Sequence, residues 1–111
     1  MQKKISNHLT EIVSRIVKEV SPEKIILFGS QAKKSARGNS DIDLLVIESA
    51  PFNKDRSRVS EIGKLERAIG NIPVSTDILI YSNEEIEKWK DSVNHIICKA
   101  MNEGKVLYAR P

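Results

Sequence analysis

The chain has 111 residues, of which 40% are hydrophobic and 30% charged, a composition typical of a globular domain that excludes a disordered, collagen-like or coiled-coil chain. We therefore expect one domain spanning residues 1–111. Apolar runs such as residues 25–28 are far shorter than the roughly 20 residues that span a bilayer, and the N-terminus has no apolar signal-peptide core. These features predict a soluble protein with no membrane partner.

Charge and cysteine content narrow the function classes further. The 18 basic and 15 acidic residues are interspersed and leave a net charge of +3, and the few aromatic residues are scattered. Dedicated nucleic-acid binders more often carry a basic stripe interleaved with aromatics. We therefore expect the chain to contact nucleic acid only through a partner protein, if at all. Cys98 is the single cysteine, which excludes an internal disulfide and a cysteine-built zinc site. The chain is therefore expected in the cytoplasm.

The first half of the chain predicts one helix and two strands. Residues 3–20 place apolar side chains at helical spacing up to a Ser-Pro stop signal. Residues 24–28 form a short apolar run that ends at a Gly-Ser pair, which predicts a buried strand followed by a sharp turn. A second buried strand is predicted for residues 42–47.

The second half predicts a helix over residues 55–70 and a third strand over residues 74–81, which carries one carboxylate. Capping-box spacing at Ser82 predicts a helix start, and the apolar residues that follow at helical spacing predict one helix or two. Residues 105–110 are expected to form a last strand or a packed tail. The alternation of helices and strands predicts an α/β domain with a mixed central sheet. We expect acids on an open face of this sheet and helices covering the other face.

Two carboxylates stand at the start of the second predicted strand. Asp41 and Asp43 share one face because side chains alternate along a strand. Two acids at short range repel each other unless a cation compensates, and carboxylate oxygens suit magnesium, which keeps positions open for substrate phosphates. Asp77 has a matching position in the third strand. If these strands are neighbours, the three acids converge.

The turn at Gly29 and Ser30 predicts the complementary half of such a site. Glycine lets a ligand approach the backbone closely, and a strand-to-helix turn presents free N–H groups and the positive end of the helix dipole to an anion. Phosphate fits this position. The turn and the acids together match nucleotidyl or phosphoryl transfer, which requires charge neutralisation around an in-line displacement.

These motifs resemble the minimal nucleotidyltransferases of the DNA polymerase beta superfamily. The resemblance rests on the sequence LFGS at residues 27–30, a ten-residue spacer, the sequence DIDLLV at residues 41–46 and the later Asp77, and it covers nearly the whole chain. It implies a nucleotidyltransferase fold in which Gly29 and Ser30 hold the triphosphate of ATP. It also implies two Mg²⁺ ions bound by Asp41 and Asp43, with Asp77 completing the metal-binding triad and helping to activate the attacking hydroxyl.

The resemblance further implies a partner and a reaction. Many similar small domains are genetic partners of HEPN-domain proteins, in toxin–antitoxin pairs where the transferase adds AMP from ATP to a tyrosine of the toxin. The chain departs from the usual family pattern after the Gly-Ser pair, where Gln31 and Lys33 replace two arginines. Lys33 can still contact a phosphate, as a point charge without the arginine fork. Assembly with itself or with the partner stays open, as do the acceptor and the preferred nucleotide.

Two alternatives to a protein adenylyltransferase stay open. The missing arginines favour a catalytically weak nucleotide-binding module that neutralises its partner by binding, whereas the retained acids count against it. A transferase acting on a small molecule is the other alternative, against which the lack of a second substrate domain counts. His8 and His95 have no partner at ligand spacing, Trp89 and Cys98 are expected to pack, and the charged residues 54–58 are expected to form the solvated start of a helix.

Overall fold

The computed structural model describes residues 2–29 and 41–111, with side chains from residue 7 onward. Its elements in chain order are α1 (Gln2–Val20), β1 (Lys24–Phe28), β2 (Ile42–Glu48), α2 (Arg58–Ile69), β3 (Thr76–Ser82), α3 (Asn83–Trp89), α4 (Ile96–Glu103) and β4 (Lys105–Ala109). The predicted helices and strands are confirmed, with boundaries that differ by a few residues. None of these helices has the length and apolar character needed to cross a membrane.

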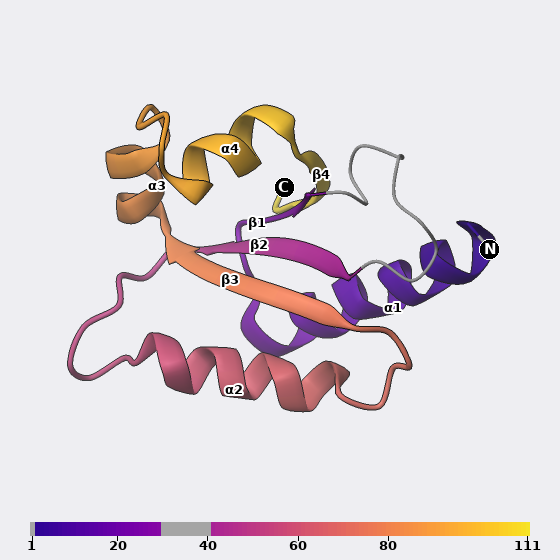
Figure 1. The fold of residues 1–111 in the computed structure, drawn as a ribbon. Coiled ribbons are helices and arrows are strands. Elements are labelled where there is room, and N and C mark those ends of the chain that lie inside the picture. The colour runs from indigo at the N-terminus through magenta and orange to yellow at the C-terminus, as the bar shows by residue number, and fades with distance from the viewer. Residues whose placement is uncertain (1, 30–40) are drawn as a thin grey trace.

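The strands form a mixed four-stranded sheet in the order β3-β2-β1-β4 (Figure 1). Strand β1 is antiparallel to both of its neighbours, β2 and β4. Strands β2 and β3 are parallel and are connected through α2. Parallel neighbours begin at the same end of a sheet, so the residues that open β2 and β3 lie next to each other.

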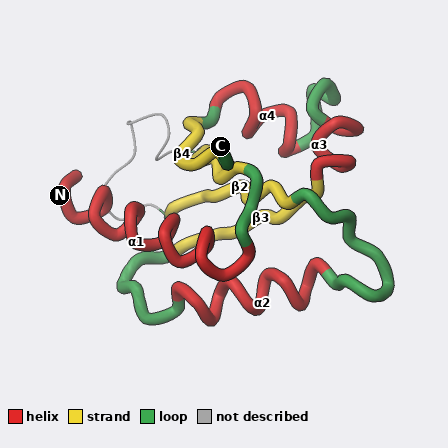
Figure 2. Tube along the Cα trace, turned by 180° about the vertical axis from the view of Figure 1, so that it is seen from behind, coloured by secondary structure: helices red, strands yellow, loops and turns green. Residues whose placement is uncertain are grey.

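Helices cover both faces of the sheet, which corrects the expectation of one open face. Figure 1 and Figure 2 both show α1 and α2 toward the lower side of the sheet and α3 and α4 above it. Ile86 of α3 and Ile97 of α4 pack with Leu45 in a cluster on the second face. The physical reason lies in the strands, because β1 buries four consecutive apolar residues and so presents apolar side chains to both sides.

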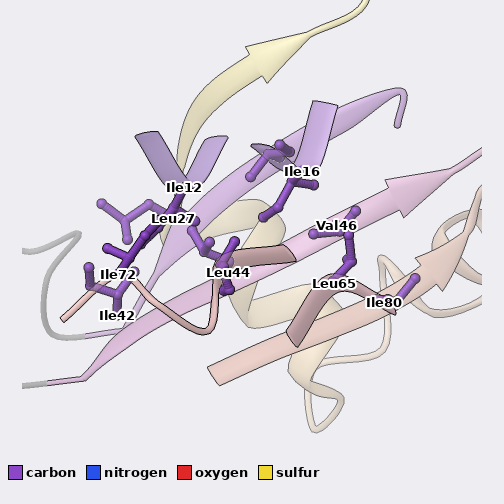
Figure 3. Packing of buried hydrophobic residues seen from close by; sticks show 11 residues of the cluster. Ile12, Ile16, Leu27, Ile42, Leu44, Val46, Leu65, Ile72 and Ile80 are labelled. Atoms are coloured by element: carbon purple, nitrogen blue, oxygen red, sulfur yellow. The ribbon is translucent and has the colours of Figure 1, made fainter. Parts of the chain in front are cut away.

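The main core lies between the sheet and the pair α1 and α2. Ile12 and Ile16 of α1 and Leu65 of α2 are fully buried against Leu44 and Val46 of β2 (Figure 3). Each such side chain stabilises the fold by roughly 1.5–3 kcal/mol through removal of its apolar surface from water. This packing holds β2 in place, and β2 carries Asp43 at its beginning.

Helix caps explain why the helical segment after β3 is divided into α3 and α4. The predicted capping box is present, because the Ser82 side chain accepts from the Glu85 N–H while the Glu85 side chain accepts from the Ser82 N–H. The helical stripe forms two helices because His95 caps a second one, its Nδ1 accepting from the Ile97 N–H at 3.1 Å. Helix α2 likewise begins three residues later than expected, at Arg58, because Ser57 is its N-cap.

Candidate functional site

Asp43 and Asp77 lie side by side across the parallel strands β2 and β3. The two residues are direct register partners. Neighbouring strands are about 4.8 Å apart, and register partners point to the same face. Leu45 and Leu79, two residues further along each strand, belong to the cluster beneath α3 and α4, which places both acids on that face at the end where β2 and β3 begin. The sequence expectation that acids from the two strands approach each other is met by this pair.

Charge repulsion is built into this pair of acids. Burial raises the pKa of Asp43 above its ordinary value, and the carboxylates of Asp77 and Asp41 raise it further. The carboxyl groups of Asp43 and Asp77 project side by side from neighbouring strands. Like charges at this range favour either a shared proton or a bound cation. Carboxylate oxygens are the ligands that magnesium prefers, so the donor chemistry of the pair fits this ion.

Gly29 brings the end of β1 against Asp43. Its φ of +74° lies in the left-handed region that glycine adopts without strain. A Cβ atom at this position would lie 3.2 Å from Asp43 Cγ and would overlap Oδ2. Phe28, the preceding residue, is the register partner of Asp43 across the antiparallel pair β1 and β2. Because residue 29 has no side chain, its backbone at the end of β1 can pack directly against the Asp43 carboxylate.

The remaining predicted site residues have different outcomes. Asp41 is exposed, directly precedes β2, and its charge reaches Asp43. Ser30 and Lys33 lie outside the described residues. Among the side chains that the structure describes, no group of three or more His, Cys, Asp or Glu residues is close enough to hold a metal ion. The described part of the chain thus brings together two acids, and the three-acid metal site stays a prediction.

Two arginines in the charged segment of residues 54–58 make contacts that the sequence pattern did not indicate. Arg56 Nη2 lies 2.7 Å from Glu48 Oε1 at the end of β2. Arg58 pairs with Glu85 and donates to the Ile80 carbonyl, and its guanidinium lies 4.7 Å from the centre of the Phe52 ring. Both arginines are half-buried, so the prediction of a solvated helix start is wrong for them. These contacts anchor the segment before α2 to the end of the sheet opposite Asp43 and Asp77.

His95, Trp89 and Cys98 all have packing or capping roles in the α3–α4 region. His95 stacks on Trp89 with ring centroids 4.8 Å apart, and its Nδ1 is occupied as the cap of α4. Trp89 packs against the cluster beneath α3 and α4, as expected. Cys98 is buried, in agreement with its predicted role as a small core residue. These three side chains therefore stabilise the packing of α3 and α4.

The sequence profile of the family described as "Polymerase beta, Nucleotidyltransferase" matches residues 10–111 of the chain. This match includes Gly29, Asp41, Asp43 and Asp77. No curated protein sequence matches the chain significantly.

Several solved structures have a similar fold. A Sulfolobus solfataricus protein presented as a candidate nucleotidyltransferase shares 19% identity with a TM-score of 0.67, the match covering 98% of this chain and 86% of that chain. A toxin–antitoxin complex with AMP-PNP shares 21% identity with a TM-score of 0.55, covering 91% of this chain and 73% of that chain. A mutant of the toxin–antitoxin MntA-HpeT shares 19% identity with a TM-score of 0.55, covering 91% and 72%. At these identities the likeness concerns the fold.

Proposed function

Because the chain belongs to the polymerase beta nucleotidyltransferase family, we propose that it transfers AMP from ATP to a hydroxyl group of a partner protein. The observation that carries this proposal is the placement of Asp43 beside Asp77, with the Gly29 backbone against Asp43. This arrangement joins a repelling carboxylate pair to a turn that a phosphate can approach. Nucleotidyl transfer needs both parts, because the triphosphate must be positioned and its charge neutralised.

In the proposed reaction the acceptor oxygen forms a bond to the α-phosphorus of ATP, and the bond from that phosphorus to the pyrophosphate oxygen breaks. Gly29 and Ser30 hold the triphosphate, with Lys33 as a further phosphate contact. Asp41, Asp43 and Asp77 would hold two Mg²⁺ ions, which when bound neutralise the developing charge on the phosphates. Asp77 orients the acceptor hydroxyl and receives its proton, which then passes to water. Pyrophosphate leaves with its own charge balanced by protons or cations from solvent.

We propose a HEPN-type toxin as the partner and a tyrosine of that toxin as the acceptor. The proposal is supported by the resemblance of residues 27–30 and 41–46 to minimal nucleotidyltransferases, and two structures of similar fold belong to toxin–antitoxin complexes, one with AMP-PNP. In this role the chain acts as an antitoxin, because the added AMP places a bulky anion on the toxin.

The position of the label in ATP tests the reaction class. The purified chain is incubated with a HEPN-domain partner, magnesium and ATP labelled either at the α- or at the γ-phosphate. We expect label in the partner from α-labelled ATP only, since AMP carries the α-phosphorus and pyrophosphate carries the γ. Asp43→Asn should abolish the transfer, whereas the exposed Asp55→Asn, which removes the same charge outside the site, should leave it unchanged.

The other outcomes select among the alternatives. Label from γ-labelled ATP would indicate a kinase and contradict the proposal. No label from either ATP, with the toxin still suppressed, would indicate a nucleotide-binding module that acts by occlusion. Label in a small molecule but not in the protein would indicate a small-molecule nucleotidyltransferase.

A further inference from the structure

A buried acidic pair lies at the end of the sheet opposite Asp43 and Asp77. Glu48, the last residue of β2, is 4% exposed and lies on the same face as Leu44 and Val46, the face that α2 covers. Arg56 Nη2 lies 2.7 Å from Glu48 Oε1 and 3.7 Å from Glu61 Oε2, so one guanidinium serves both carboxyl groups. Lys64 Nζ lies 3.3 Å from Glu61 Oε1 on the solvent side.

Hydrogen bonding at this pair is incomplete. Glu48 Oε2 and Arg56 Nη1 are both buried and have no hydrogen-bond partner. The Glu61 carboxyl group nevertheless lies beside that of Glu48, because both approach the same nitrogen of Arg56. Two ionised carboxylates are both acceptors and cannot bond to each other. A proton on Glu48 supplies the missing donor.

The charges around the pair agree with this protonation. Burial, and to a smaller extent Glu61, raises the pKa of Glu48 to about 7 against the opposing effect of Arg56. The pKa of Glu61 is lowered by hydrogen bonds from Glu48 and Lys64 despite its burial. From β3, the register partner of Glu48 is Ser82, whose hydroxyl is engaged in the cap of α3.

We propose that Glu48 and Glu61 share one proton in the folded protein and that this proton closes a latch, by which Arg56 and the segment of residues 49–57 are held on the end of the sheet. Loss of the proton to water leaves two like charges beside a single guanidinium, and Glu48 relieves the repulsion by turning toward solvent. Arg56 then loses its buried partner. The attached turn loosens with it, because the Arg56 guanidinium also lies 4.5 Å from the centre of the Phe52 ring.

The pH window follows from the raised pKa of Glu48. The closed state keeps the proton up to about pH 7, whereas an open, solvated Glu48 loses it near its ordinary value of 4.5. Opening therefore releases a proton between these values, and the opening constant rises by up to about tenfold per pH unit before it levels off above pH 7. The latch is tightest in mild acid and loosest above neutrality.

Hydrogen–deuterium exchange of the backbone amides in residues 49–57 tests the latch, after correction for the intrinsic pH dependence of exchange. In the parent protein the corrected rate should rise from pH 5 to pH 7 and then level off. Glu48→Gln, whose amide donates permanently, should keep the slow rate at every pH. Glu66→Gln, an exposed change on α2, should follow the parent. A flat parent profile, or a Glu48→Gln profile that follows the parent, would overturn the proposal.

A direct titration keeps the test decisive if Glu48→Gln does not fold. Carboxyl ¹³C shifts in the parent should show one member of the pair titrating near pH 7. Titration of both Glu48 and Glu61 near their ordinary values would overturn the proposal. The latch makes no use of ATP or a partner, so its failure and the failure of the proposed transferase function are distinguishable.

Discussion

The backbone of Gly29 lies directly against the carboxylate of Asp43. A side chain at position 29 would come within 3.2 Å of Asp43 Cγ and overlap its Oδ2. The φ of +74° also favours glycine at this position, independently of the room available for a side chain. The same residue that allows a close phosphate approach in our proposal thus also determines where the neighbouring acid can lie.

Gly29→Ala is therefore expected to weaken binding of magnesium-ATP by about tenfold or more. The methyl group displaces the Asp43 carboxylate, and the left-handed backbone strains a residue with a Cβ by roughly 1–2 kcal/mol. Isothermal titration calorimetry measures the binding, and chemical denaturation measures the free energy of unfolding, which should fall.

Gly63→Ala is the matched control for that change. Gly63 lies inside α2, and a Cβ there meets only the flexible end of Arg67 at 3.3 Å. Alanine favours a helix over glycine by about 1 kcal/mol, so this variant should be more stable and bind magnesium-ATP like the parent. Equal nucleotide affinity in the Gly29 and Gly63 variants would contradict a phosphate role for the turn.

Asp43→Asn is expected to raise the free energy of unfolding of the ligand-free protein at pH 7. A carboxyl group whose pKa is raised in the folded state stabilises the fold fully only below its unfolded pKa, and that contribution is lost as the pH rises through the folded pKa. At pH 7 the ionised Asp43 thus opposes folding, and a neutral amide removes the repulsion. Thermal denaturation should also show that magnesium-ATP no longer raises Tm, because the amide is a poor replacement for a carboxylate ligand.

Asp55→Asn provides the control for net charge, since Asp55 is exposed in the turn before α2. This variant should keep the stability of the parent and its full Tm rise with magnesium-ATP. A ligand-free Asp43→Asn protein that is less stable than Asp55→Asn at pH 7 would show that repulsion does not dominate at Asp43.

The strands and the acid motif could be predicted from the sequence because local patterns determine them. Residues 24–28 and 42–47 are short apolar runs bounded by turn residues, and alternation alone assigns Asp43 to one face. The same runs contained the information needed to avoid the one wrong prediction about layers. A strand with apolar side chains on both faces requires cover on both, and α3 and α4 supply it.

Long-range pairing could not be predicted in the same way. A glutamate at a strand end is by default solvated, and the burial of Glu48 depends on Arg56 and Glu61 arriving from the segment before α2 and from α2 itself. Arg58 and Glu85 meet across 27 residues for the same reason. Local sequence contains no signal for such contacts, because the folding of β2, α2 and β3 creates them.

Ser21→Gly tests a strained helix end and is expected to raise the free energy of unfolding by up to about 1 kcal/mol. Ser21 follows α1 with a φ of +46°, where a non-glycine residue pays roughly 1–2 kcal/mol and glycine recovers part of this after its larger entropy loss. The Ser21 carbonyl that accepts from Arg110 is retained in the variant. Urea denaturation measures the change.

Ser14→Gly makes the same chemical change on the exposed side of α1 and should destabilise the protein by about 0.5 kcal/mol. Opposite signs for the two serines would locate the gain in the backbone conformation of Ser21. A loss of stability in both variants would contradict the presence of strain at that position.

Asp77→Asn separates binding from chemistry in the proposed reaction. Asp43 lies against the Gly29 backbone and beside Asp77, so its loss should impair nucleotide binding. Asp77 lies on the edge strand β3, is exposed, and is proposed to receive the acceptor proton. A group that takes a proton in the transition state contributes typically 10² to 10⁴-fold to the rate. Asp77→Asn should therefore keep most of the ATP affinity, measured by calorimetry, and lose about 10²-fold or more of the α-label transfer to the partner. Transfer at the parental rate would show that Asp77 has no catalytic role, and equal suppression of the toxin by parent and variant without any transfer would show that the chain acts by binding alone.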